Sequence, residues 1–123
     1  ITPGPGVDIV HDATQPWPGT FGRFDVVVCT EVLEHVEQWP ALLGTAAQAL
    51  EPGGPEALFV TCASTGRPQH GASGAPLPAP GEWYANVPPD AVAVRLQELF
   101  RAAWVEYREL PGDVYARTQG VKR

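Results

Sequence analysis

Two continuous apolar runs stand out in the pattern of hydrophobic and polar positions along the chain. Residues 24–30 read Phe-Asp-Val-Val-Val-Cys-Thr, and residues 57–63 read Ala-Leu-Phe-Val-Thr-Cys-Ala. Short runs of this kind, rich in β-branched residues, are typical of strands that are buried on both faces, as in a parallel sheet. We therefore expect a buried strand at Phe24–Thr30 and a second one at Ala57–Ala63.

A helix is predicted between these strands, over Pro40–Leu50. Proline suits the first turn of a helix, and Pro52-Gly53-Gly54 supplies an end signal. The spacing i, i+3, i+4, i+7 places four apolar residues on one face of this helix: Leu43, Ala46, Ala47 and Leu50.

The rest of the chain has weaker signals. We expect a short strand at Val7–Val10, and a second helix from Pro88 to about Arg101. The segments Trp104–Leu110 and Asp113–Gly120 flank Pro111-Gly112, which predicts an antiparallel hairpin. The second helix would carry an apolar stripe of Val92, Leu96, Leu99, Phe100 and Ala103.

Residues 64–87 form the segment with the least regular pattern. They contain four glycines and four prolines, so we expect a mobile loop without helix or strand. Strands that alternate with helices predict a single α/β domain with a mostly parallel sheet, closed by the antiparallel hairpin.

Composition and charge narrow the classes of function. The 123 residues include 8 basic and 14 acidic side chains, a net charge of −6, which is unfavourable for nucleic-acid binding. No apolar run is long enough to span a membrane, and no basic-then-apolar leader opens the sequence. Cys29 and Cys62 both lie in apolar runs, so we expect reduced thiols and a cytoplasmic protein.

The block from Phe24 to Cys62 resembles the second half of the class I S-adenosylmethionine-dependent methyltransferases. The Phe-Asp strand runs into Glu-Val-Leu-Glu-His at 31–35, a helix ends at Glu-Pro-Gly-Gly, and the next strand ends near Thr61. Residues 6–13 and 104–121 extend the resemblance to both ends of the chain. It implies a Rossmann-like sheet and methyl transfer from S-adenosylmethionine to an acceptor, for which a small molecule fits the negative charge better than RNA or DNA.

The glycine-rich cofactor loop of that family, of the type D-x-G-x-G, has no counterpart in the sequence. Methionine is absent, and residue 1 is Ile. We therefore expect residues 1–123 to be a partial methyltransferase domain, incomplete at its amino end and part of a longer chain. Alone, the chain would be marginally stable, would not bind S-adenosylmethionine tightly, and could self-associate through an exposed sheet edge.

The resemblance also implies roles for individual residues. Asp12 and Ala13 would hold the adenine ring, and Cys29 and Thr30 would lie near the methionine part of the cofactor. The alternatives are a turn-forming Asp12 and a Cys29 that only packs in the core.

The acceptor side would be built from two segments. Glu31 and His35 would face the acceptor, one of them as the general base. In the following loop, His70, Trp83 and Tyr84 would contact the substrate; the alternative is that Trp83 and Tyr84 anchor the loop to the core.

Some members of this family hold a divalent cation with E-x-x-E-H, which here is Glu31, Glu34 and His35, with His70 as a further ligand. Carboxylates and imidazole are suitable ligands, but a packing role for His35 is the favoured alternative. A shared ion requires carboxyl oxygens of Glu31 and Glu34 within about 4–5 Å of the His35 ring nitrogens.

Two other functions stay open: a non-catalytic remnant of the fold that acts as a binding or assembly domain, and an unrelated α/β metalloenzyme.

Overall fold

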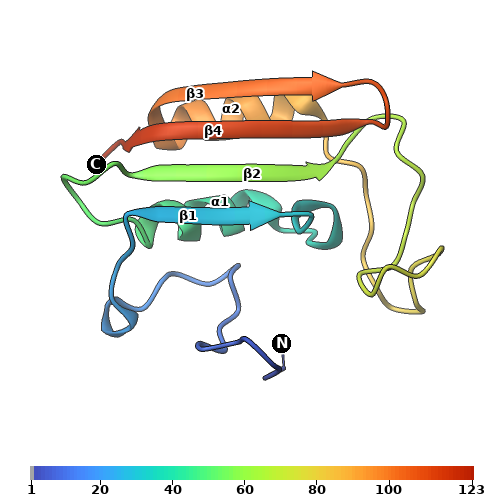
Figure 1. Cartoon of the computed structure of the whole chain (residues 1–123), viewed down its shortest axis with the longest axis horizontal. Helices are drawn as coiled ribbons and strands as arrows, with labels where there is room; N and C mark the ends of the chain where they lie inside the picture. The colour runs from blue at the N-terminus through green and yellow to red at the C-terminus, as the bar shows by residue number, and fades with distance from the viewer. Residues whose placement is uncertain (1) are drawn as a thin grey trace.

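The structure is a computed structural model that describes residues 2–123, and it is built around one four-stranded sheet (Figure 1). The strand order is β1-β2-β4-β3; β1 and β2 are parallel, and the other two pairs are antiparallel. In chain order the elements are η1 (Gly19–Phe21), β1 (Val26–Thr30), η2 (Leu33–His35), α1 (Trp39–Gln48), β2 (Ala57–Ala63), α2 (Pro89–Leu99), β3 (Phe100–Arg108) and β4 (Asp113–Val121).

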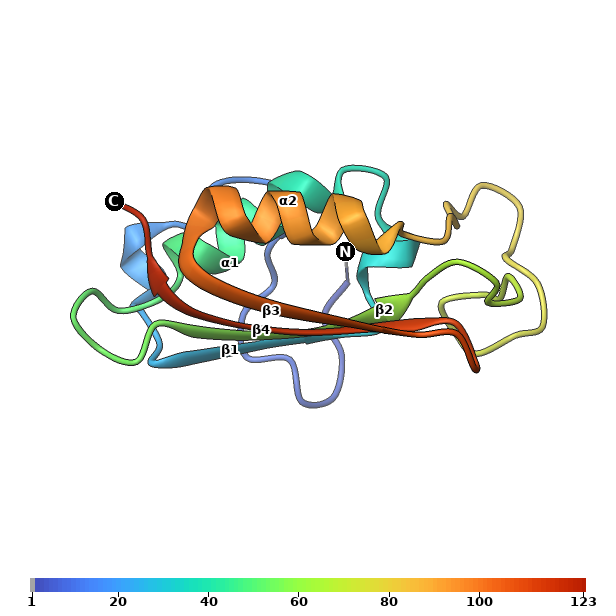
Figure 2. The ribbon, with the colours of Figure 1, turned by 90° about the horizontal axis from the view of Figure 1, so that it is seen from above.

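Both α-helices lie on the same face of the sheet (Figure 2). Their apolar sides pack on alternate residues of the strands, such as Leu58, Val60 and Val114, which are at most 1 % exposed. The face predicted for the first helix is confirmed, because Leu43 and Leu50 are fully buried. The α/β class and the closing hairpin are confirmed as well. The described sheet is mixed and not mostly parallel, because only β1 and β2 pair in parallel and β4 pairs antiparallel with both of its neighbours.

The opposite face of the sheet is open, which corrects the expectation that both apolar runs form strands buried on both faces. In β2, Phe59 is 44 % exposed on this face. Val26 and Val28 are 45 % and 65 % exposed, whereas Cys29, on the helix side, is 8 % exposed. The cause is the one-sided placement of α1 and α2: within residues 2–123, no helix packs on the other side of β1. Alternate residues of the strand therefore point to solvent.

Strand β2 has the predicted bounds, but β3 begins earlier than expected. Phe100 and Ala103, assigned by the apolar spacing to the second helix, lie in the strand. Phe100 has extended backbone angles and pairs with Val121, and Ala103 pairs with Thr118. Sheet hydrogen bonds therefore determine the conformation here and override the helical spacing of the side chains.

The strand predicted at Val7–Val10 is wrong. Both valines are 48 % exposed, and no strand of the described sheet accepts this segment as a neighbour. The segment that follows is instead held against α1 by two hydrogen bonds. The Thr45 hydroxyl donates to the Gln15 carbonyl at 2.8 Å, and the Trp17 amide donates to the Gln48 side chain at 2.9 Å.

Residues 64–87 contain no helix or strand, as predicted, and they cross the end of the molecule where β2 ends (Figure 1). The two ends of the loop are tied together, because Ser64 Oγ donates to the Val87 carbonyl at 2.7 Å. In its distal part, the Glu82 carboxylate accepts a hydrogen bond from the Ala79 amide at 3.1 Å. The predicted mobility of the loop stays a prediction.

Candidate functional site

The carboxyl ends of β1 and β2 lie at the same end of the sheet because these strands are parallel. The turn η2 follows β1 after two residues, and the loop 64–87 follows β2 directly. This topology brings together residues that are far apart in the sequence: Glu34 and His35 from η2, and His70 and Tyr84 from the loop. In open α/β sheets, ligands bind at this end of the strands.

Glu31 lies at the point where β1 ends, and its backbone has a φ of 54°, which is unusual for a residue other than glycine. Its amide still donates to the Thr61 carbonyl at 2.8 Å. Its carboxylate accepts from Thr61 Oγ1 at 3.1 Å and lies 3.9 Å from the Arg67 guanidinium. The charge of Glu31 is thus directed towards β2 and the loop stem.

Three aromatic rings meet next to this turn. The ring centroids are 5.0 Å apart for His35 and His70, 5.5 Å for His35 and Tyr84, and 4.9 Å for His70 and Tyr84. The Tyr84 hydroxyl donates to Asn86 Oδ1 at 2.7 Å, which fixes its ring. Trp83 makes none of these ring contacts and is 45 % exposed, so the structure does not bring it to the predicted substrate side.

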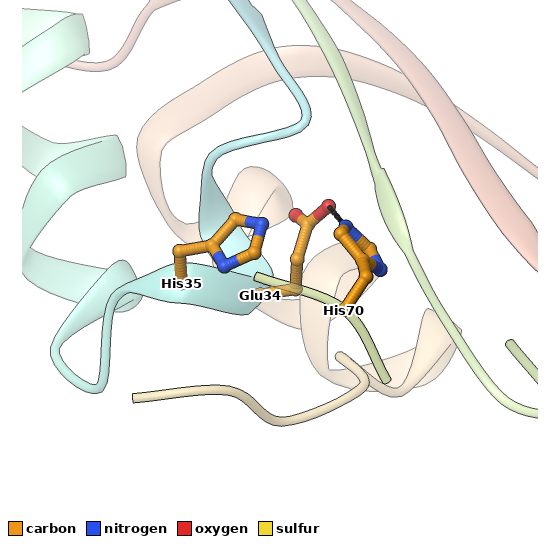
Figure 3. A group of neighbouring side chains, drawn as sticks. All are labelled: Glu34, His35 and His70. Carbon is orange, nitrogen blue, oxygen red and sulfur yellow. Dashed lines mark ion pairs between the residues drawn. The ribbon is translucent and has the colours of Figure 1, made fainter. Parts of the chain in front are cut away.

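Glu34 is fully buried, and neither of its carboxyl oxygens has a hydrogen-bond partner. The nearest basic atom is His70 Nε2, 3.9 Å from Oε1 (Figure 3). Burial raises the pKa of Glu34, and the neighbouring Glu31 carboxyl raises it further. A buried carboxyl group of this kind favours either a bound proton or a bound cation, because burying an uncompensated negative charge is costly.

Both histidine rings lie beside this carboxyl group (Figure 3). His35 Nδ1 is buried and has no hydrogen-bond partner, and burial together with His70 lowers the pKa of His35. His70 Nδ1 lies 3.3 Å from the Pro68 carbonyl. If Nδ1 carries the proton and donates it there, Nε2 presents a lone pair towards Glu34.

One ligand atom each from Glu34, His35 and His70 lies within 4.8 Å of the others (Figure 3). Glu31 does not belong to this group, in contrast to the set Glu31, Glu34 and His35 expected from the spacing. The reason is the direction of its carboxylate, which contacts Thr61 and Arg67. A carboxylate with two imidazoles is a suitable ligand set for a first-row divalent metal ion.

The residues predicted for cofactor binding lie apart from the group of Glu34, His35 and His70. Ala13 and Cys29 line one apolar cavity of about 380 Å³, together with Val32 and Trp17. Thr30 is exposed and does not line this cavity, so the structure brings Ala13 and Cys29 together but not Thr30.

Asp12 forms a local turn, which was the alternative to its predicted role as an adenine ligand. Its Oδ1 accepts from the Thr14 amide at 2.9 Å and from the Thr14 hydroxyl at 2.7 Å. These hydrogen bonds lower the pKa of Asp12, so it is ionised near neutral pH. A turn-forming aspartate and an adenine ligand are compatible, because only one carboxyl oxygen is used.

Both cysteines are free and buried. Burial, with a smaller effect of Glu34, raises the pKa of the Cys29 thiol to about 11 and that of Cys62 to about 12. The thiols are therefore neutral near pH 7 and pack as small apolar groups.

Arg67 and Asn86 form the stem of the loop and were not predicted from the sequence. The Arg67 guanidinium forms an ion pair with Asp113 at the start of β4, and Asn86 Nδ2 donates to the Arg67 carbonyl at 2.9 Å. The one signal in the sequence is that Arg67 is the single basic residue other than histidine in 64–87. Its partner Asp113 is distant in the sequence, so the pattern alone could not identify the pair.

The arrangement of elements and the site at the strand ends define a Rossmann-like α/β domain of the methyltransferase type. A family model described as a methyltransferase domain matches residues 2–106, and the chain belongs to that family. This membership excludes the alternative of an unrelated metalloenzyme fold. No curated protein matches the sequence.

Two solved structures are similar to the chain. One is the "DhpI-SAH complex structure", with 19% sequence identity and a TM-score of 0.63; the match covers 92% of this chain and 54% of that chain. The chain thus spans about half the length of this relative. The other, an O-methyltransferase family protein from Burkholderia thailandensis, has 18% identity, a TM-score of 0.47, and coverage of 80% and 31%.

Among residues 2–123, no helix is long and apolar enough to cross a membrane.

Proposed function

We propose that this chain is the carboxyl-terminal part of a longer methyltransferase, which transfers a methyl group from S-adenosylmethionine to a small-molecule acceptor. The observation that carries the proposal is the convergence of the Glu31–His35 turn with His70 and Tyr84 at the carboxyl ends of two parallel strands. Family membership supports methyl transfer, and the net charge of −6 favours a small acceptor over a nucleic acid.

The chain's own residues would bind the cofactor around the carboxyl end of β1. The Asp12 carboxylate accepts a hydrogen bond from the adenine amino group, and the Ala13 backbone contacts the ring. Cys29 packs against the bound cofactor, and Thr30 lies beside its methionine part. When bound, S-adenosylmethionine supplies a methyl group on a positively charged sulfur atom.

On the acceptor side, His35 acts as the general base. Its lowered pKa leaves the ring neutral near pH 7, so it can take the proton of an acceptor hydroxyl as the new bond to the methyl group forms. Glu31 is the less suitable base because its charge already faces Arg67 and Thr61. His70 and Tyr84 form a wall that orients the acceptor, and Trp83 would contact only its outer part.

The test is S-adenosylhomocysteine formation by the longer protein, with S-adenosylmethionine and a panel of phenols and carboxylic acids as acceptors. We expect product with at least one acceptor, and a His35→Gln variant that loses about 10²-fold in kcat with little change in KM. A Trp83→Ala variant is the matched control, with a small effect on kcat. If the longer protein does not bind S-adenosylhomocysteine, the alternative of a non-catalytic remnant replaces this proposal.

A second candidate function concerns a cation beside the acceptor. The specific observation is the buried Glu34 carboxyl group without hydrogen-bond partners, with one ring nitrogen each of His35 and His70 within 4.8 Å of it and of one another. We propose that these three residues hold a divalent metal ion, which would neutralise the buried charge and polarise an acceptor oxygen.

The 123-residue chain itself permits the test of this site. We expect Mn²⁺ or Zn²⁺ to raise the melting temperature of the wild type but not that of Glu34→Gln or His70→Ala. The Glu82→Gln variant is the matched control, since Glu82 belongs to the same loop and lies outside the group. An equal rise for all four proteins would show that the ion binds elsewhere, and no rise would exclude the site.

A further inference from the structure

The long loop after β2 has two arms, which are held by different parts of the sheet. The first arm, residues 64–70, is bound to the hairpin of β3 and β4. The Ser64 amide donates to the Gly112 carbonyl at 2.7 Å, and the Arg67 guanidinium forms an ion pair with Asp113. Both contacts lie at or just before the start of β4, so the position of the first arm is set by that strand.

The second arm, residues 82–87, is held by η2 and by the end of β2. The Ala85 amide donates to the Glu34 carbonyl at 2.9 Å, and the Val87 amide donates to the Ala63 carbonyl at 3.0 Å. The position of the second arm is therefore set by the turn after β1 and by β2, and not by β4. A contact between the two arms would fix the distance between these two parts of the candidate site.

The half-buried side chain of Asn86 makes this contact. Its Nδ2 donates to the Arg67 carbonyl of the first arm at 2.9 Å, and its Oδ1 accepts from the Tyr84 hydroxyl at 2.7 Å. The same hydroxyl lies 3.3 Å from the Pro68 carbonyl, which also belongs to the first arm. Because one end of the amide donates and the other accepts, both ends of the Asn86 side chain are used.

The ring that Asn86 holds lies against both histidines of the candidate site. The Tyr84 centroid is 5.5 Å from that of His35, on η2, and 4.9 Å from that of His70, on the first arm. Burial and the neighbouring Glu34 carboxyl group raise the pKa of Tyr84, so its hydroxyl is protonated near pH 7. Since its one proton is directed to Asn86, the hydroxyl supports the ring and does not exchange a proton with the acceptor.

We propose that Asn86 is a positioning residue for the acceptor: it joins the two arms and so holds the rings of Tyr84 and His70 beside His35. This role rests on the proposed function, in which the two rings form the wall that orients the acceptor. His35 lies on η2, and the residues proposed for the cofactor also lie outside the loop. Loss of the Asn86 side chain therefore loosens the wall and leaves the general base and the cofactor in place, so the effect appears mainly in KM.

Steady-state kinetics of the longer protein test the proposal, with an acceptor that the wild type methylates. We expect Asn86→Ala to raise the KM for the acceptor about 10-fold, the factor of one ordinary hydrogen bond, and to change kcat by less than about 3-fold. Asn86 is the only asparagine of the chain, so the matched control is Gln69→Ala. This control removes the same amide group from an exposed position of the first arm and should leave KM unchanged.

A double-mutant cycle separates positioning from a general loss of stability. Tyr84→Phe keeps the ring but breaks the same link, so it should raise KM several-fold in the wild type and add less than about 2-fold to Asn86→Ala. Tyr107→Phe is its control, because the Tyr107 hydroxyl donates to the Thr65 carbonyl at 2.6 Å, in the same loop but outside the group of rings. The affinity for S-adenosylhomocysteine, measured by calorimetry, should be equal in all variants.

An acceptor KM of Asn86→Ala within about 2-fold of the wild-type value would overturn the proposal. Additive effects of the two substitutions, or an equal loss of affinity for S-adenosylhomocysteine, would also overturn it, because the role of Asn86 would then be general stability. If Asn86→Ala does not fold, Tyr84→Phe carries the test, and an unchanged KM in that variant has the same meaning. A wild type that methylates no acceptor contradicts the proposed function, and the role of Asn86 falls with it; an active wild type with unchanged KM in the variants overturns this role alone.

Discussion

Replacing Glu34 by glutamine isolates the cost of the buried carboxyl group. The side chain is fully buried, its two oxygens have no hydrogen-bond partner, and burial raises its pKa. Glutamine has nearly the same shape but cannot ionise, and its amide group can donate towards His70 Nε2. The variant therefore removes the ionisable carboxyl group and leaves the packing of η2 unchanged.

The sign of the effect on stability follows from the raised pKa. Between the ordinary pKa of glutamate and the higher pKa of Glu34 in the folded state, the folded protein binds more protons than the unfolded protein. The free energy of unfolding of the wild type therefore falls as the pH rises through this window, and the substitution Glu34→Gln removes this fall. Leaving a buried charged group without a partner costs about 1–3 kcal/mol or more. We expect Glu34→Gln to be more stable than the wild type by about that amount at pH 8, and by little or nothing near pH 4.5.

Urea unfolding of both proteins between pH 4.5 and 8, with a chelator present, measures this difference. Glu37→Gln, at an exposed position two residues after His35, is the control and should follow the wild type at every pH. A constant difference between Glu34→Gln and the wild type across the range would refute the reasoning, as would a Glu34→Gln variant that is less stable at pH 8.

Three further predictions concern the surroundings of the site. Gly112→Ala should lower the stability by about 2 kcal/mol, measured by thermal unfolding, because φ is +104° and the new Cβ would lie 2.7 Å from the Thr65 carbonyl oxygen. Cys29 and Cys62 should react with a thiol reagent at pH 8 only as fast as the protein unfolds; rapid labelling of the native chain would contradict their burial. Thr45→Val should destabilise the chain by about 1 kcal/mol through the lost hydrogen bond to Gln15, and Thr45→Ser should restore most of it.

The sequence alone predicted those helices and strands whose local pattern of apolar residues agrees with their place in the fold. Strand β2 lies centrally in the sheet, and both of its ends were predicted, although Phe59 in its apolar run is 44 % exposed on the face without helices. The helix over Trp39–Gln48 has a proline at its start and an apolar face that packs on the sheet. At Phe100, by contrast, the apolar spacing continues into β3, and only the pairing with Val121 shows where the helix ends.

The sequence indicated individual residues of the candidate site, but not which of them the fold brings together. The spacing of Glu31, Glu34 and His35 suggested one ligand set, but the strained backbone at Glu31 directs its carboxylate to Thr61 and Arg67. The approach of His70 depends on the path of a 24-residue loop, which is fixed by contacts such as Arg67 with Asp113. Such long-range contacts leave no periodic signal in the sequence.

Calorimetric titration with S-adenosylhomocysteine tests the central claim most directly, performed on the 123-residue chain and on the longer protein that we propose contains it. The account predicts saturable binding in the micromolar range by the longer protein, weakened about 10-fold by Asp12→Ala through one lost hydrogen bond. Thr14→Val is the control, because it removes one hydrogen bond to Asp12 but keeps the carboxylate. The account also predicts no saturable heat for the 123-residue chain. Absence of binding by the longer protein would contradict the proposed function, and tight binding by the 123-residue chain would contradict its incompleteness.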